Sequence, residues 1–314
     1  MTGIRGSFRF RDAKCIGEYL HSGATPIDYR KDSVVAVSTL VNEMNLYWKH
    51  QLKKGDDLTI TFGQFFTDFE EHSFAKSAGL VNFCIDVRSN SKKVLEITKK
   101  QLLKKIKNIF NINLNIFIRT VLLTFSFLWF TYLGTQIGED YVAANAILIN
   151  LVFLSAFILD AYAFSTEGIV GYSLGKKDLN LFKQIIKNSF ILSSLSGLVI
   201  SIIYLFTYDH VINLMSDIKE IRELSTSYVV WLIILPIISS FCYQFDGIFI
   251  GTSQTKELRN AMIFSVLIYL IISILLTKFL FNTGIWISLC IFMILRAISL
   301  FYYLDKIYLR FRSN

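Results

Sequence analysis

Six long apolar segments in the last two-thirds of the chain constrain its fold more than any other feature. Each is long enough to cross about 30 Å of hydrocarbon, a distance that takes about 20 helical residues. Lipid tails satisfy no backbone polar group, so such segments cross a bilayer as helices. The sequence therefore predicts an all-α bundle of six transmembrane helices near residues 115–134, 142–172, 188–207, 228–252, 262–281 and 284–304.

The charges between these segments indicate an orientation. Connections on one side carry fourteen Lys and Arg residues, including those of KKQLLKKIKN, whereas connections on the other side carry three. Loops rich in Lys and Arg stay in the cytoplasm. This asymmetry predicts a multi-pass protein of the lipid bilayer with both termini in the cytoplasm. Because the basic residues flank apolar segments, the net charge of +8 does not indicate a nucleic-acid partner.

Three acidic residues fall inside the predicted spans. Asp160 lies near the middle of the second span, and Glu167 follows seven residues later on the same helical face. Asp246 lies in the fourth span. A charge inside a bilayer is costly and usually faces a bundle interior or a wet cavity. We interpret the three as a site for cation or proton coupling, or as part of a substrate cavity. The alternative is that water or a lysine side chain satisfies Glu167 and Asp246 near the cytoplasmic ends.

Other residues within the spans have simpler interpretations. Arg119 and Arg296 are expected to be structural. Small residues let two helices approach closely in a membrane. Four glycines are candidates for such contacts: Gly168, Gly171, Gly247 and Gly251.

Residues 3–105 predict a different kind of domain. Apolar and polar residues alternate in SFRFRD, KCIGEYL, LTITFGQF and LVNFCIDVR, which is typical of strands. Two amphipathic helices are indicated by SVVAVSTLVNEMNLYWKHQL and KKVLEITKKQLLKKI. This order predicts a two-layer α/β sandwich of the ferredoxin-like β-α-β type. The predicted fold class is therefore mixed, with an α/β domain over residues 1–106 and a membrane domain over residues 107–314.

The membrane domain resembles one lobe of a known transporter family at three stretches: NIFIRTVLLTFSFLWFTYLGTQIGEDYVAANAILIN, LDAYAFSTEGIVGYSLGKKD and FDGIFIGTSQTKELRNAM. These stretches are similar to the C-terminal six-helix lobe of DinF-type members of the multidrug and toxic-compound extrusion (MATE) family, over about residues 108–310. The resemblance implies antiport of small organic, often cationic, compounds across the bacterial inner membrane. It implies a proton or sodium as the coupling ion and no other cofactor. Because such transporters have two lobes, it also implies a homodimer or a complementary N-terminal lobe as partner.

The N-terminal domain resembles a second family at HSGATPIDYRKDSVVA and GLVNFCIDVRS. These stretches are similar to the lid, or dimerisation, domain of zinc-dependent amidohydrolases such as allantoate amidohydrolase and N-carbamoyl-amino-acid hydrolases. The resemblance implies that His21 reaches a partner subunit's active site and that Arg88 binds the substrate carboxylate. The zinc ligands and general base of these enzymes belong to a catalytic domain that no part of this chain resembles. We therefore expect no zinc and no enzyme activity, with His21 and Arg88 as relics.

Three hypotheses follow for the whole chain. The first is a membrane transport protein whose lobe pairs with itself or with a separate lobe. The second is a membrane-tethered lid domain that acts through a catalytic partner. The third is a fusion without function or a wrongly assembled gene. We choose MATE-like transport as the predicted activity.

Overall fold

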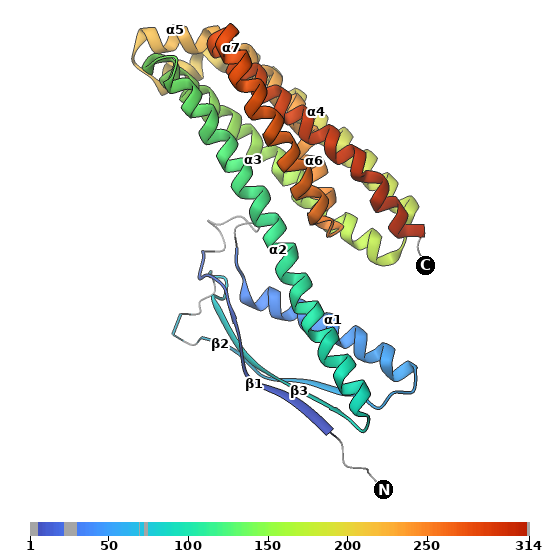
Figure 1. Cartoon of the computed structure of the whole chain (residues 1–314). Helices are drawn as coiled ribbons and strands as arrows, with labels where there is room; N and C mark the ends of the chain where they lie inside the picture. Colours follow the sequence, from blue (N-terminus) through green and yellow to red (C-terminus); the bar gives the residue numbers. More distant parts are fainter. Residues whose placement is uncertain (1–5, 22–29, 69, 72–74, 313–314) are drawn as a thin grey trace. The chain divides into compact units, whose positions relative to one another are not determined.

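A computed structural model of the chain describes residues 6–21, 30–68, 70–71 and 75–312. The chain divides into two compact units, unit 1 (residues 1–111) and unit 2 (residues 112–314). The division falls inside a single helix, α2 (Lys92–Thr135), as does the expected boundary at residues 106–107. The strands belong to unit 1, whereas the long apolar helices belong to unit 2 (Figure 1).

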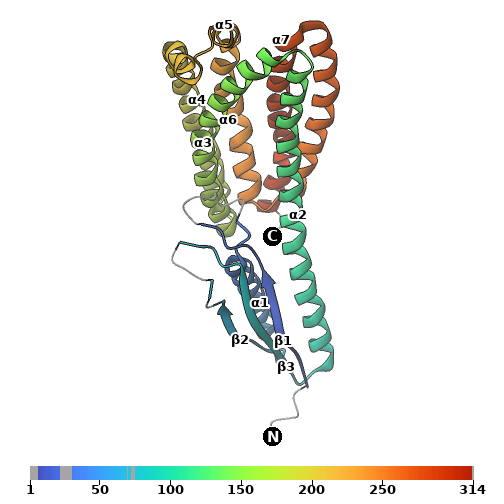
Figure 2. The ribbon, with the colours of Figure 1, turned by 90° about the vertical axis from the view of Figure 1, so that its left-hand side faces the viewer.

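Unit 1 contains an antiparallel sheet with the strand order β1-β3-β2. Its elements are β1 (Gly6–Ile16), α1 (Ser33–Lys53), β2 (Thr59–Thr67) and β3 (Leu80–Ser89), followed by the first turns of α2. Because β1 and β2 both run antiparallel to β3, they are parallel to each other, with β3 between them. Every second side chain of β3, from Val81 to Val87, is buried in the core of the unit. Helix α1 covers one face of the sheet (Figure 2).

The first two predicted strands are one strand, β1, so the described part of unit 1 has three strands and the prediction of four is wrong. Phe8 and Phe10 pair with core-facing residues of β3. The register then shifts, and Ala13 and Cys15 take the core-facing positions. The one extra residue of this irregularity moves the apolar positions from even to odd numbers. The alternation therefore reads as two strands in the sequence.

Unit 2 is a bundle of helices. After α2 come α3 (Glu139–Lys176), α4 (Leu179–Met215), α5 (Lys219–Ser227), α6 (Val229–Gly251) and α7 (Thr255–Arg312). Five helices in the described part of the chain are long and apolar enough to cross a membrane: α2, α3, α4, α6 and α7. The short helix α5 lies in the polar connection between α4 and α6, where no helix was predicted. The chain is therefore mostly helical, with one small sheet near its N-terminus.

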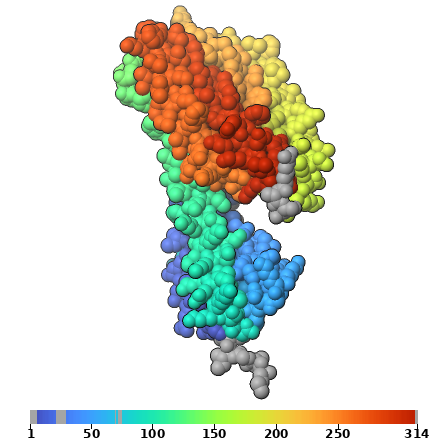
Figure 3. All heavy atoms as spheres, turned by 45° about the vertical axis from the view of Figure 1, so that its right-hand side comes forward, coloured from blue at the N-terminus to red at the C-terminus, as the bar shows by residue number. Residues whose placement is uncertain are grey.

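Helix α7 folds back on itself. Its backbone leaves the helical conformation at Phe281, where φ is 50° and ψ is −132°, at the end of the fifth predicted span. Lys306 donates a hydrogen bond to Glu257 at 3.1 Å, although 49 residues separate them. A Cβ atom placed on Gly284 would lie closer than 3.0 Å to the backbone of Leu276. The two arms therefore run antiparallel, and Figure 3 shows them against each other on one face of unit 2.

Candidate functional site

The most strongly charged buried group in unit 2 is centred on Asp246 of α6. Arg296 of α7 donates a hydrogen bond to Asp246 Oδ2 at 2.6 Å, and Arg119 of α2 donates to the same oxygen. Asp246 is 4% exposed and Arg296 is 1% exposed. Three helices therefore bring two guanidinium groups onto one carboxylate, away from solvent. The two arginines predicted to be structural are the ion-pair partners of a predicted site residue.

This cluster is incompletely hydrogen-bonded. Asp246 Oδ1 and Arg119 Nε have no hydrogen-bond partner among the described residues. Nearby on α6, Gln244 accepts a hydrogen bond from Thr166 of α3 at 2.9 Å, while its amide nitrogen has no such partner. Buried polar groups are usually satisfied, and exceptions concentrate where water, an ion or a change of state is involved. The cluster is thus a polar site inside an apolar bundle.

Asp160 belongs to the same electrostatic neighbourhood. It is half-buried on α3, and its carboxylate lies within electrostatic range of Arg296 and Tyr243. Arg119, Asp246 and Arg296 together carry a formal charge of +1. A negative charge on Asp160 would therefore balance the group, whereas a proton on Asp160 would leave it positive. The sequence could not indicate this relation, because the three partners come from three different helices.

Glu167 lies further along α3, where α3 and α6 touch. Its side chain is half-buried. A Cβ atom on Gly251 would come closer than 3.0 Å to the backbone of Glu167, and one on Gly247 would do the same with Ala163. Gly171 lies in the same contact: a Cβ atom placed on it would be 3.1 Å from the carbonyl oxygen of Gly251.

The expectation of close helix approach is confirmed for Gly171, Gly247 and Gly251. It is wrong for Gly168, because a Cβ atom there would meet nothing within 4 Å. Gly168 and Gly171 are three residues apart on α3 and point about 60° apart around the helix; of the two, Gly171 is the one that faces α6. Only the side that meets α6 requires small residues.

A second buried polar group was missed by sequence reasoning. Asn145 of α3 and Asn282 of α7 exchange two amide hydrogen bonds, at 2.6 and 3.1 Å. Trp286 adds a third at 2.9 Å to Asn145. The three residues are 0–3% exposed. Because Asn282 follows directly on Phe281, this group ties the turn of α7 to α3, and two Asn residues in apolar segments were its only sequence signal.

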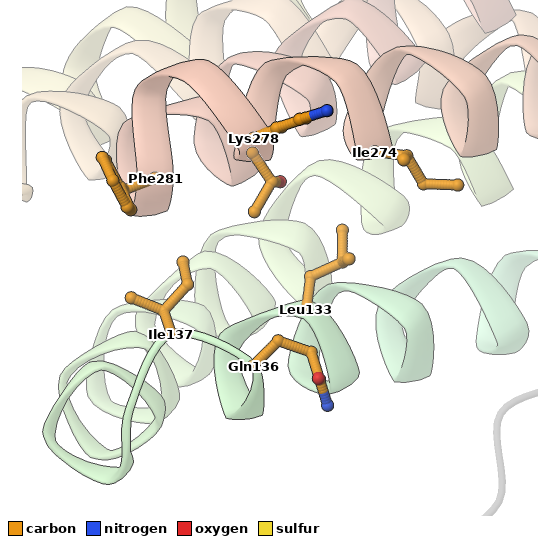
Figure 4. A pocket seen from close by; sticks show the side chains of 7 residues that line it. Leu133, Gln136, Ile137, Ile274, Lys278 and Phe281 are labelled. Atoms are coloured by element: carbon orange, nitrogen blue, oxygen red, sulfur yellow. The ribbon is translucent and has the colours of Figure 1, made fainter.

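A small pocket lies between α2 and α7, away from the acidic residues (Figure 4). None of the predicted site residues lines it. Its volume of about 300 Å³ is at the lower limit of ordinary ligand sites. It is lined by Leu133, Gln136, Ile137, Ile274, Thr277, Lys278 and Phe281.

Unit 1 holds the two other predicted site residues, His21 and Arg88. His21 is exposed and forms an isolated bridge with Lys76, while the rest of its motif, residues 22–29, lies outside the described residues. Arg88 is exposed and pairs with Asp86 at 2.6 Å. Hydrogen bonds from Arg88, and then from Arg9, hold the pKa of Asp86 below its ordinary value. The structure does not bring His21 and Arg88 into one hydrogen-bonded group among the described residues.

No group of three or more His, Cys, Asp or Glu residues with metal-binding geometry occurs in the part of the chain that the structure describes. His72 lies outside that part.

The long apolar helices and the charges buried between them define a multi-pass membrane protein. Residues 116–276 match the family model described as MatE. The chain therefore belongs to the MatE family.

Two known proteins are similar to the membrane part of the chain. DNA damage-inducible protein F of Escherichia coli (strain K12) is 32% identical over 189 residues, which are 60% of this chain and 41% of that protein. A solved multidrug resistance MATE family transporter of the MOP superfamily, in an outward-facing conformation, superposes with a TM-score of 0.61 at 15% identity. That match covers 72% of this chain and 49% of the transporter. The chain thus spans less than half the length of these relatives, and the structural match shows the fold alone.

The likeness of unit 1 to amidohydrolases is weaker. A hydantoinase/carbamoylase family amidase from Burkholderia ambifaria is 23% identical over 33% of this chain and 24% of that protein, with a TM-score of 0.30. A score this low carries no argument about fold or function.

Proposed function

We propose that unit 2 is one lobe of a MATE-type antiporter that exchanges a small organic, often cationic, compound for a proton or sodium ion. Membership of the MatE family carries this proposal. In it, α7 crosses the bilayer twice, once with each arm, so that unit 2 makes six crossings. A second lobe completes the central cavity, supplied by another copy of the chain or by a separate polypeptide.

Asp160 is the residue to which we assign coupling. Asp246 is already paired with two arginines, so its charge is used within the protein. Asp160 lies within electrostatic range of Arg296, on a different helix from Asp246. Taking up a cation or proton at Asp160 removes the charge that balances the arginines. We assign Asp246 to holding the arginines and Glu167 to the wall of the cavity.

The charges at the two ends of unit 2 support a proposal for its placement in the membrane. The α3–α4 turn, the α6–α7 turn and the end of α7 lie at the same end of the bundle. A salt bridge joins Lys306 to Glu257, and Phe182 packs on Tyr308 and Phe311. Basic residues outnumber acidic ones there. We therefore propose that this end faces the cytoplasm of a bacterial inner membrane, with both termini on that side.

Transport by reconstituted full-length protein tests this function. Proteoliposomes with an imposed proton or sodium gradient should accumulate a fluorescent organic cation, and one of the two gradients should be required. Asp160→Asn should abolish the dependence on that gradient, whereas Asp209→Asn, an exposed acid at the other end of the bundle, should not. Coupled transport that survives Asp160→Asn unchanged would remove Asp160 from the site. Absence of transport under either gradient, also after mixing with a candidate second lobe, would refute the function.

A second candidate function rests on unit 1. The strand order β1-β3-β2 with α1 as the crossover matches part of the ferredoxin-like arrangement expected for a lid domain. In this alternative, unit 1 serves a separate zinc amidohydrolase, with Arg88 exposed at the end of β3 to bind a substrate carboxylate. Co-purification with such an enzyme, and hydrolysis of a carbamoyl substrate that is lost in Arg88→Gln, would support it. Equal hydrolysis with and without the chain would refute it.

A further inference from the structure

The turn between α3 and α4 is tight and its acidic residue is engaged in capping. Lys177 has a left-handed backbone with φ of 58°, and its N–H donates to Leu174 O at 3.1 Å to close α3. One residue later, the side chain of Asp178 accepts a hydrogen bond from Leu181 N at 2.9 Å, which caps α4. Two residues therefore join the helices, and the one carboxylate of the turn is directed at the backbone.

Besides Lys177 within the turn, three exposed lysines flank it. Lys176 lies in the last turn of α3, and Lys183 and Lys187 lie four residues apart on one side of α4. None of the three forms an ion pair with a described residue. Lys176 makes a cation–π contact with Tyr172, with its Nζ atom 4.5 Å from the ring centroid. We call these three residues the turn lysines.

Other basic residues at the same end are engaged within the protein. Lys306 pairs with Glu257. Arg310 donates a hydrogen bond at 2.7 Å to Thr252 O, at the end of α6. These side chains stabilise the bundle itself, whereas the turn lysines have no such acceptor among the described residues. Their charge is available to a partner outside the chain.

The turn lysines continue the apolar surface of their helices. One helical turn after Lys187, an exposed apolar stripe begins on one side of α4. It consists of Ile191, Leu195, Leu198 and Ile202, each 46–55% exposed. On α3, Tyr172 is 57% exposed and precedes Lys176 by one turn. At 1.5 Å per residue, Lys187 lies about 6 Å beyond the first apolar side chain of the stripe. That distance is about the depth of the headgroup layer outside the hydrocarbon.

We propose that the turn lysines bind the headgroups of anionic phospholipids in the leaflet next to the α3–α4 turn. The lipid tails lie along the exposed stripe of α4, and the lipid phosphates meet Lys176, Lys183 and Lys187. A lysine near an anionic membrane surface contributes about 1 kcal/mol, which is a factor of about five in binding. Three lysines therefore give a preference for anionic over zwitterionic lipid of about two orders of magnitude.

Native mass spectrometry of the full chain tests this proposal. Detergent-purified protein is titrated with phosphatidylglycerol or phosphatidylcholine of identical tails, and the lipids retained per chain are counted. We expect wild type to retain at least about fivefold more phosphatidylglycerol. The variant Lys176→Gln/Lys183→Gln/Lys187→Gln, which keeps only Lys177 at this turn, should lose most of this preference.

Matched controls separate the turn lysines from general charge. A second triple variant removes the same charge from exposed positions at the C-terminal end of α1 and the residue after it: Lys49→Gln, Lys53→Gln and Lys54→Gln. It should keep the preference, as should replacement of the turn lysines by arginine. Equal preference in the Gln variant and the α1 control would overturn the proposal.

Two measurements on wild type stand even if the Gln variant does not fold. Raising the salt from about 0.05 M to about 0.5 M should weaken retention of phosphatidylglycerol, because the lysines are exposed and salt screens them. Soluble glycerol phosphate should not displace the lipid. If retention of phosphatidylglycerol does not depend on salt, or if soluble glycerol phosphate displaces the lipid, the proposal that the turn lysines bind membrane lipid is wrong.

Discussion

Replacing Asp246 by asparagine removes the carboxylate that accepts hydrogen bonds from Arg119 and Arg296, at nearly unchanged volume. The side chains of the three residues are 6%, 12% and 2% exposed. At an effective dielectric constant of about 20, a pair of unit charges about 4 Å apart is worth about 4 kcal/mol. Breaking a buried ion pair from one side typically costs about 3–5 kcal/mol, because the remaining charge stays buried without a counterion. We expect Asp246→Asn to lower the free energy of unfolding by about that amount.

The assay is equilibrium unfolding of the purified protein in mixed micelles, followed by tryptophan fluorescence. Asp209→Asn is the matched control, because Asp209 is exposed and, among the residues the structure describes, its one side-chain hydrogen bond is with Asn213 at 3.3 Å. Its effect should stay within about 0.5 kcal/mol.

A compensated variant separates lost charge balance from lost packing. Replacing the whole cluster with apolar residues, as Arg119→Met/Asp246→Leu/Arg296→Met, removes all three charges together. Buried ion clusters can be replaced in this way with little or no loss of stability. We therefore expect this variant to be more stable than Asp246→Asn. If Asp246→Asn costs no more than the Asp209 control, the arginines do not depend on Asp246 and the reasoning fails.

Three further predictions concern packing, buried polarity and pH. Gly251→Ala should destabilise the protein by about 1–3 kcal/mol, because its Cβ atom overlaps α3; Gly168→Ala, in open space, should stay within about 0.5 kcal/mol in the same unfolding assay. Asn145→Ala should cost about 1–3 kcal/mol, since it leaves buried donors and an acceptor without partners; a neutral result would contradict the amide pair. The pKa of Asp86 is lowered in the folded state, so its contribution to stability is complete above the ordinary aspartate pKa and is lost as the pH falls through the lowered value. Arg88→Gln should raise that pKa in an NMR titration of the Asp86 carboxyl, and an unchanged midpoint would contradict the assigned cause.

Local patterns explain what could be predicted from this sequence. The apolar segments are continuous and long, so four of them appear within α2, α3, α4 and α6 close to their expected positions. Alternation located the strands because one face of the sheet is buried and the other is not. It failed only at β1, where an irregularity between Phe10 and Ala13 shifts the phase of a single strand.

The chemistry of the candidate site could not be predicted in the same way. Asp246 is separated in the sequence from Arg119 by 127 residues and from Arg296 by 50 residues, and a local sequence pattern cannot indicate contacts between residues so far apart. The one available signal is physical: an acid and two bases inside apolar spans must find partners. Sequence reasoning weighed these residues separately. It therefore treated the arginines as structural and Asp246 as a coupling residue or one satisfied by water or a lysine.

The pairing of Arg119 with Asp246 also sets an order of events during synthesis. Arg119 enters the membrane with α2, and its counterion is made 127 residues later. At about 5–20 residues per second, the delay is about 6–25 s. Throughout that time α2 holds an arginine whose burial costs up to about 3.5 kcal/mol at the centre of a bilayer. The first apolar helix of unit 2 must therefore be kept in place by its remaining side chains, or by the machinery that inserts it, until α6 arrives.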